Sequence, residues 1–521
     1  MVLILPVFEL HQPRRLKRQF GRALQLGTKP ESFFDDDLNR ETFLRVSRDA
    51  YLPALDLILK PLEDGDFRCA LCMSGTLLEQ AAAWSPELVY KIKKIVDTSY
   101  CELIAQPYYN SLSCLLSSED LASQLDMQQM ATKKLFNQAS KTAKNTGLIS
   151  RDDVWKVMRA LGFNSAIIEG TGRLLGFRSP NFLYASGNLN SGNSGSDVLR
   201  LIPRNYFLSD MVNFRFTEAG PDGGPLQPGY YMDLVLSQKG DFVLLDLNLE
   251  AFGEYFGKES GIMGFLESLP EEAQKRPEVC WGTPGQAAKT LEPMGVIDAK
   301  DYSSAADSEK DLSAWTGNEL QRYCLENLRY LHHLVKSAED LRMWRLLGQS
   351  DNFLYMSLKG GVDGEIHSYF SHFSSPVEAF STFLWTLTDF RSKIYARLGG
   401  KAGSYRMLYG DLPDAHAFHF HAGMGRPVGV KAANLISLKA AVQAVDVAVL
   451  RFHLSRGDLK RWVGEVLGNQ QLAEEIRRLE GCAGADDPRE ALVQAIASAI
   501  EDANSQLQSG GAKVAKAGSL H

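Results

Sequence analysis

The segment Leu244-Leu-Asp-Leu-Asn-Leu-Glu-Ala-Phe-Gly-Glu254 decides the fold of this chain. Its apolar first half is typical of a buried strand, and the glycine and glutamates that follow indicate a polar turn. Asp246 and Asn248 are two residues apart, so on a strand both side chains point to the same face. We therefore expect a strand that brings polar groups to its carboxyl end.

Apolar runs of this kind alternate with helical periodicity over the first 275 residues. The candidate strands are 2–8, 67–73, 101–105, 165–168 and 242–247. Apolar residues at helical spacing cover 41–59, 86–96, 118–136 and 152–161. Strands that alternate with helices predict βαβ units around a parallel sheet, and therefore an α/β fold.

The pattern changes after residue 310. Helical periodicity covers 319–336, 338–347 and 376–398, whereas the glycine-containing stretch 401–410 is typical of a linker. A short alternating stretch at 415–422 precedes further helices, and the small, polar, basic residues 509–521 predict a disordered tail. We expect three domains, at 1–275, 276–400 and 411–508.

Composition excludes several classes of function. The 56 basic and 63 acidic residues give a net charge of −7, which argues against nucleic-acid binding through phosphate contacts. No apolar run reaches the roughly 18 residues that span a bilayer. Seven cysteines do not suggest a disulfide framework, Cys69 and Cys72 are interpreted as buried thiols, and we expect a reducing cytoplasm. No nucleotide or dinucleotide fingerprint is present, and we expect no cofactor and no metal, including at His416, His419 and His421.

Short motifs in a fixed order give a more specific indication. They include His11-Gln-Pro-Arg-Arg-Leu16, Ser74-Gly-Thr-Leu-Leu-Glu-Gln80, Gly176-Phe-Arg-Ser-Pro-Asn181 and Trp344-Arg-Leu-Leu-Gly-Gln-Ser-Asp351. With the opening segment, they resemble glycoside hydrolase family 57, in its α-amylase-like branch, from residue 1 to about 398. The resemblance implies an incomplete (β/α)7 barrel followed by a helical bundle. It also implies a retaining mechanism on α-glucans such as glycogen, starch or maltooligosaccharides. Residues from about 411 resemble, more weakly, an uncharacterised helical domain found beside carbohydrate-active enzymes.

The resemblance places the two catalytic positions. A retaining glycosidase needs two carboxyl groups about 5 to 5.5 Å apart. The family's nucleophile is the Glu of a motif like Asn-Thr-Glu-Leu-Ile-Tyr, and Asn145-Thr-Gly-Leu-Ile-Ser150 puts Gly147 there. The general acid is the Asp of Asp-Tyr-Glu-Thr-Phe-Gly-Glu-His, which corresponds to Asn248. Both catalytic carboxylates are therefore predicted to be replaced, with Asp246 as a candidate displaced acid.

Neighbouring positions change in the same direction. Gln106, Asn110 and Asn352 stand where the family has a glutamate and two histidines. Amides bind sugar hydroxyls but do not exchange protons near neutral pH. The predicted sugar-binding residues are His11, Gln12, Gln106, Tyr109, Asn110, Asn248, Glu250, Trp315, Asp351 and Asn352.

Three hypotheses follow. The first is a catalytically inactive, glucan-binding protein of α-glucan metabolism. The second is an active α-1,4-glucan hydrolase or glucanotransferase that uses relocated carboxylates. The third is a regulatory partner of a glycogen-metabolism enzyme that acts through residues 411–505.

Overall fold

The computed structural model describes residues 2–18, 30–187, 198–335, 337–398, 401–410, 412, 414, 416–480 and 487–508. They form two compact units. Unit 1 comprises the described residues of Met1–Phe20, Glu31–Arg322 and Arg345–Phe383, and unit 2 those of Tyr323–Trp344 and Leu384–His521. The predicted tail at 509–521 lies outside the described residues, and the predicted domain boundaries remain predictions.

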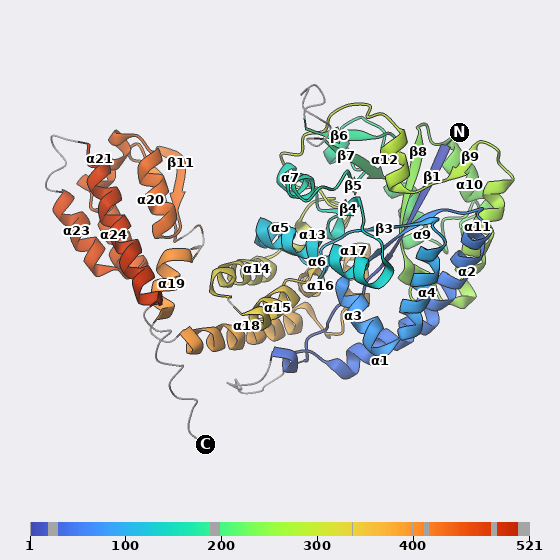
Figure 1. Cartoon of the computed structure of the whole chain (residues 1–521), viewed down its shortest axis with the longest axis horizontal. Helices are drawn as coiled ribbons and strands as arrows, with labels where there is room; N and C mark the ends of the chain where they lie inside the picture. The colour runs from blue at the N-terminus through green and yellow to red at the C-terminus, as the bar shows by residue number, and fades with distance from the viewer. Residues whose placement is uncertain are drawn as a thin grey trace, which may run out of the picture. The chain divides into compact units, whose positions relative to one another are not determined.

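Seven parallel strands of unit 1 form a nearly closed barrel (Figure 1). They are β1 (Val2–Leu10), β2 (Cys69–Met73), β3 (Cys101–Ile104), β4 (Thr142–Lys144), β5 (Ser165–Glu169), β7 (Leu199–Arg204) and β8 (Phe242–Asn248). Their order is β3-β2-β1-β8-β7-β5-β4, and a parallel bridge between Ala105 and Ala143 connects the two ends. β6 (Tyr184–Ser186) pairs with β7, and β9 (Val279–Trp281) pairs with β1. The α/β class and the seven-stranded barrel are confirmed.

Side chains of the barrel strands alternate between two cores. On β1, Leu5 and Val7 belong to a cluster shared with the other barrel strands, whereas Ile4 and Phe8 pack in the larger cluster with the helices. The same alternation turns Glu9 inward above Val7. Polar residues occupy this inward position near the carboxyl ends of four other strands: Lys144, Glu169, Arg204, Asp246 and Asn248. The barrel therefore has an apolar interior and a charged layer at its carboxyl end.

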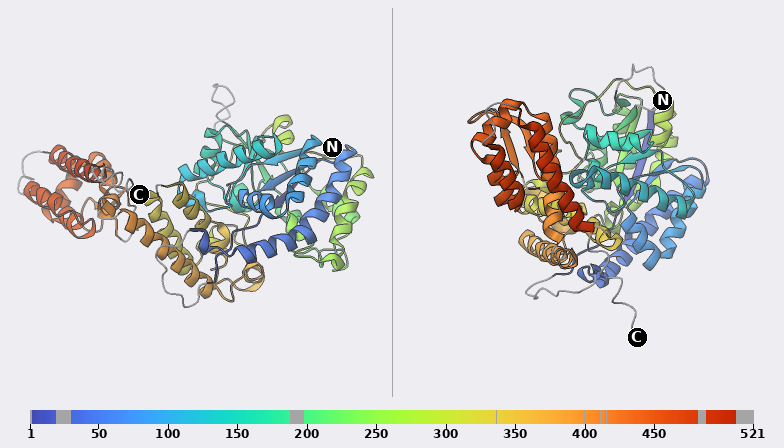
Figure 2. Two further views of the ribbon diagram at one scale, coloured as in Figure 1. Left: turned by 60° about the horizontal axis from the view of Figure 1, so that its bottom comes forward. Right: turned by 60° about the vertical axis from the view of Figure 1, so that its left-hand side comes forward.

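Helices surround the strands of unit 1 (Figures 1 and 2). They are α1 (Asp36–Val46), α2 (Leu52–Glu63), α3 (Gly75–Trp84), α4 (Pro86–Asp97), α5 (Ser113–Leu116), α6 (Ser118–Phe136), α7 (Asp152–Ala160), α8 (Gly172–Leu175), α9 (Tyr206–Asn213), α10 (Pro228–Ser237), α11 (Ile262–Gln274) and α12 (Pro284–Thr290). The helices expected at 86–96, 118–136 and 152–161 are present. The helix expected at 41–59 is also present, as α1 and α2 joined without a break by the π-helical turn Ser47–Tyr51.

The remaining elements are mainly helical. After the barrel come α13 (Ser313–Thr316), α14 (Glu319–Leu331), α15 (Ala338–Leu347), α16 (Ser350–Leu354), α17 (Gly361–Phe370) and α18 (Pro376–Leu398). Unit 2 then contains α19 (Ala402–Tyr409), β10 (Phe418–His421), β11 (Pro427–Ala432), α20 (Leu435–Ala444), α21 (Val447–Ser455), α22 (Asp458–Arg461), α23 (Gln470–Glu480) and α24 (Arg489–Gln508). The predicted linker at 401–410 is wrong, because α19 packs Leu408 into the core of this unit. Within the described ranges, every helix is too short or too polar to span a bilayer.

Candidate functional site

A cavity of about 290 Å³ opens at the carboxyl ends of the barrel strands. Its walls come from β1, β4, β7 and β8 and from the segments that follow them. The sequence-predicted residues that line it are His11, Gln12, Asn110, Gly147, Asp246, Asn248, Glu250, Trp315 and Asp351. Active sites of parallel barrels lie at this end of the strands. The barrel thus brings together most of the residues that sequence patterns singled out.

The indole of Trp315 fills the space beside Gly147. Gly147 lies in the turn after β4, with φ +55° and ψ 25°. A Cβ atom at this position would lie 2.5 Å from Cη2 and 2.8 Å from Cζ2 of Trp315. The Trp315 side chain is 2% exposed, and its buried Nε1 has no hydrogen-bond partner among the residues that the structure describes. A glutamate at residue 147 would therefore require both a left-handed backbone and a different position of the indole.

The amide of Asn248 lies at the end of β8, on the cavity wall. Its backbone N–H donates to Asn213 Oδ1 at 2.9 Å, and Asn213 Nδ2 donates to the backbone oxygen of Asp246 at 2.9 Å. These bonds fix the backbone on both sides of Leu247. A carboxamide at this place can bind a hydroxyl, but it cannot supply the proton that a leaving oxygen needs.

Lys144 occupies the centre of the charged layer. Its Nζ lies 2.6 Å from Glu9 Oε2, 2.8 Å from Asp246 Oδ2 and 3.1 Å from Asp246 Oδ1. Although burial opposes its charge, the two carboxylates raise the pKa of Lys144 above its ordinary value. Both carboxylate oxygens of Asp246 are therefore occupied by the Lys144 ammonium, so the side chain considered as a displaced acid is held in an ion pair inside the barrel.

A second buried cation lies at the end of β7. Arg204 Nη1 donates to Glu169 Oε2 at 2.9 Å, and its Nη2 binds Asp210. Lys310 Nζ lies 3.7 Å from Asp210 Oδ2 and 4.0 Å from Glu169 Oε2. Burial opposes the charge of Arg204, but these carboxylates hold its pKa above the usual range. The carboxylates of Glu169 and Asp210 thus balance the positive charges of Arg204 and Lys310 within the protein.

His11 is ion-paired with Asp351. His11 Nε2 lies 3.0 Å from Asp351 Oδ2, and Nδ1 lies 2.7 Å from Ser74 Oγ. Burial alone would lower the pKa of His11, but the Asp351 carboxylate raises it above its ordinary value. The same contact outweighs burial at Asp351 and lowers the pKa of that carboxyl. Each member of the pair therefore favours the charged form of the other.

Glu250 has different partners from the other carboxyl groups of the cavity, because within the described residues it is bound by hydrogen-bond donors and not by an ammonium or imidazole side chain. Its Oε1 accepts hydrogen bonds from the His11 backbone N–H at 3.0 Å and from the Tyr51 hydroxyl. Burial raises the pKa of Glu250 to about 7, although both bonds oppose the shift. Glu250 can therefore hold or release a proton near neutral pH, which is a property of general acids.

Three predicted sugar-binding residues do not line the cavity. With its amide oriented to match its neighbours, Gln106 donates to Glu9 Oε1 at 3.2 Å and accepts from the Ser74 N–H at 2.9 Å. Asn352 Nδ2 donates to the carbonyls of Leu346 and Leu347, both at 3.1 Å, at the end of α15. Tyr109 is 2% exposed. Gln106 and Asn352 thus bind neighbouring protein groups, and Tyr109 is packed in the interior.

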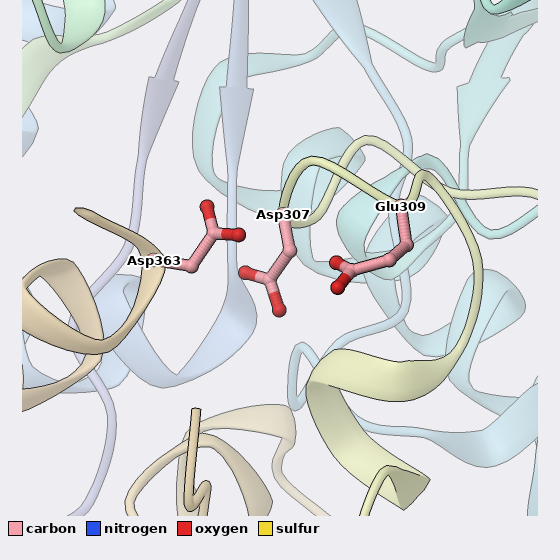
Figure 3. Close-up of side chains that lie close together, drawn as sticks. All are labelled: Asp307, Glu309 and Asp363. Carbon is pink, nitrogen blue, oxygen red and sulfur yellow. The ribbon is translucent and has the colours of Figure 1, made fainter. Parts of the chain in front are cut away.

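Three carboxylates outside the cavity form an acidic cluster. Figure 3 shows Asp307 and Glu309 on one loop and Asp363 near the start of α17, with one oxygen of each within 4.8 Å of the others. Lys359 Nζ already lies 2.7 Å from Asp307 Oδ2 and 2.6 Å from Glu309 Oε2. The ammonium supplies the positive charge, so this cluster does not need a metal. In unit 2, the His419 and His421 rings contact backbone carbonyls.

The cavity also contains residues that the sequence patterns did not identify. They include Glu9, Arg15, Lys144, Arg204, Asn213, Phe214 and Phe370. A charged residue at the carboxyl end of an apolar strand could have identified Glu9, since such ends carry function in parallel barrels. The aromatic rings had no comparable signal, because their spacing fits core packing equally well.

Comparison with known proteins agrees with this geometry. Residues 6–300 match the family described as Glycosyl hydrolase family 57. A protein of Methanocaldococcus jannaschii named "Putative alpha-amylase" is 34% identical over 397 residues, which cover 74% of this chain and 83% of that protein.

Solved structures share the fold at low sequence identity. A branching enzyme of Thermococcus kodakaraensis has a TM-score of 0.51 and 12% identity, and the match covers 76% of this chain and 92% of the branching enzyme. A branching enzyme of Pyrococcus horikoshii has a TM-score of 0.50 and 14% identity, and the match covers 71% of this chain and 87% of that enzyme. A 4-alpha-glucanotransferase of Thermococcus litoralis has a TM-score of 0.50 and 13% identity. The match covers 68% of this chain but only 55% of the glucanotransferase. The matched residues and the barrel together lead to one conclusion: the chain belongs to glycosyl hydrolase family 57.

Proposed function

We propose that this protein binds α-glucan in the barrel cavity without hydrolysing it by the retaining mechanism of its family. The observation that carries the proposal is the position of Trp315, whose indole overlaps the space where the side chain of residue 147 would begin. Without a carboxylate at residue 147, no glycosyl ester can form there, because glycine offers no nucleophilic atom.

The states of the remaining carboxyl groups support the same proposal. A retaining enzyme needs one carboxylate free to attack and one carboxylic acid that donates a proton. Glu9 and Asp246 are paired with Lys144, and Asp351 is paired with His11. These ion pairs occupy the carboxylate oxygens and fix the positions of the three side chains. The fourth carboxyl group of the cavity, Glu250, accepts hydrogen bonds from the His11 N–H and the Tyr51 hydroxyl, so all four carboxyl groups on the described wall are engaged by neighbouring protein groups.

The cavity retains groups that suit a neutral, hydroxyl-rich ligand. Trp315 Nε1 is a buried donor and Asn110 Oδ1 is a buried acceptor, and neither has a partner within the described residues. Both residues line the cavity, together with the amides of Gln12 and Asn248. A sugar ring carries hydroxyls that donate and accept, so it can satisfy groups of both kinds.

Two measurements test the proposal. Electrophoresis through gels containing glycogen or amylose should retard the full chain, and Trp315→Leu should reduce the retardation. A second gel without polysaccharide corrects for changes of charge or shape. Overnight incubation with maltoheptaose, followed by chromatography, should give the same products as buffer alone. Unretarded migration in both polysaccharides would contradict the proposed binding.

One observation favours a second candidate, hydrolysis by relocated carboxyl groups. Glu250 has a pKa of about 7 and shares the cavity with the Asp246 carboxylate, so an acid and a base are present together. This candidate predicts slow product formation from maltoheptaose that Glu250→Gln and Asp246→Asn each abolish. Products that persist in both variants would exclude these two residues as its source.

A further inference from the structure

Four aromatic rings lie together at the cavity mouth, and we call Phe214, Tyr255, Tyr369 and Phe370 the aromatic ledge. Phe214, Tyr255 and Phe370 line the cavity. Tyr369 stacks on Tyr255, with ring centroids 5.2 Å apart and an interplanar angle of 20°. Tyr369 is 54% exposed and Phe214 is 38% exposed. The ledge therefore continues from the cavity wall to the protein surface.

The rings of the ledge come from three separate segments. Phe214 follows α9, Tyr255 lies in the turn after β8, and the other two residues end α17. Tyr255 forms edge contacts with Phe214 at 6.4 Å and with Phe370 at 4.6 Å between centroids. Since segments far apart in the sequence converge here, the ledge is built by the tertiary fold rather than by one exposed helix face.

The exposed ring is also fixed in place. The Tyr369 hydroxyl donates to the backbone oxygen of Glu254 at 3.0 Å. The carboxylate of Glu254 is in turn bound by Arg45 through both guanidinium nitrogens, with Nη2 at 2.8 Å from Oε1. An anchored ring loses little conformational entropy when a ligand covers it.

We propose that the aromatic ledge is a second binding site, continuous with the cavity, for successive glucose units of a linear α-glucan. The inference rests on the proposed function and adds where the glucose units that extend beyond the cavity bind. An aromatic ring offers a flat apolar surface, and a sugar ring has C–H groups on its faces and hydroxyls around its edge. Stacking therefore buries apolar area while the hydroxyls keep their hydrogen bonds to water. The four rings carry no charge, which suits a neutral polymer.

The affinity of chains of different length tests the ledge. We would titrate maltose, maltotriose and maltoheptaose into the full chain by calorimetry. The wild type should bind maltoheptaose at least tenfold more tightly than maltose. Tyr369→Ala should weaken maltoheptaose binding about fivefold, as expected for the lost apolar contact, and change maltose binding less than twofold. Tyr369→Phe should retain most of the affinity, because the stacking ring remains.

A matched control separates the ledge from a general effect of losing a tyrosine. Tyr90 on α4 is 59% exposed, lies under Lys94 and does not line the cavity. Tyr90→Ala should leave all three affinities unchanged. If Tyr369→Ala binds maltoheptaose as tightly as the wild type, the ledge is not a binding site, although the cavity proposal stands. If the wild type binds none of the three sugars, both proposals are wrong.

Discussion

The overlap between residue 147 and Trp315 can be measured by comparing two glycine substitutions. Gly147 and Gly162 both have left-handed backbones, with φ +55° and φ +78°. A Cβ at Gly162 would meet no heavy atom within 4 Å, whereas a Cβ at Gly147 would meet the Trp315 indole at 2.5 Å. An alanine in this region costs about 1–2 kcal/mol for its backbone alone. The overlap adds about 1–3 kcal/mol of overpacking at residue 147.

Gly162→Ala should therefore reduce the free energy of unfolding of unit 1 by about 1–2 kcal/mol, and Gly147→Ala by about 2–5 kcal/mol. Urea denaturation followed by far-ultraviolet circular dichroism gives both values. Trp315→Leu in each glycine background completes a double-mutant cycle, in which the excess cost of Gly147→Ala should disappear. Equal costs of the two alanines, within about 0.5 kcal/mol, would refute the claim that the indole occupies this space.

Four further predictions concern the groups that line the cavity. Gly147→Glu with Asn248→Asp should give no product from maltoheptaose, because the indole must move before the carboxylate can enter; chromatographic products above the buffer control would contradict this. Lys144→Met should reduce stability by about 3–5 kcal/mol, since two carboxylates lose their buried partner, whereas Lys93→Met at an exposed pair should cost less than about 1 kcal/mol in the same urea assay. Burial raises the pKa of Glu250 from 4.5 to about 7, so the folded state binds a proton that the unfolded chain releases. Stability should therefore fall as pH rises through this window, by an amount on the order of 3 kcal/mol, and Glu250→Gln should remove that slope in urea titrations at several pH values. Asp351→Asn should lower the pKa of His11, which proton NMR of the imidazole would detect, because burial would then act without the opposing carboxylate.

Sequence periodicity identified five of the seven barrel strands. β4 was missed because it has three residues, one of them a lysine, so it offers no alternating apolar pattern. β7 was missed because Arg200, Pro203 and Arg204 interrupt its apolar residues. In both strands the charged residue that breaks the apolar pattern is stabilised by the tertiary structure. Lys144 and Arg204 each pair with a carboxylate on another strand. Such partners are invisible to any local pattern.

The candidate site was partly accessible from the sequence. Motif order placed Gly147, Asn248, His11 and Asp351 in one region, and these residues line one cavity. The role of Trp315 was not accessible, because it depends on the short helix α13, more than 160 residues away in the sequence, packing over Gly147. Nor could the sequence separate Asp246, which is paired with Lys144, from Glu250, which burial leaves with a pKa of about 7.

The charged layer of the barrel is difficult to explain by stability alone. Buried ion pairs contribute little net stability, and apolar side chains of similar size often serve as well. The layer directly beneath is apolar, and Leu5, Val7 and Leu244 fill it. Strands β1, β4 and β8 place Glu9, Lys144 and Asp246 one step higher, on the wall of the cavity. Paired charges keep this wall polar and open without leaving a free nucleophile. Binding of a hydroxyl-rich ligand requires such a wall, whereas retaining cleavage requires two carboxyl groups that, in our proposal, Gly147 and Asn248 replace.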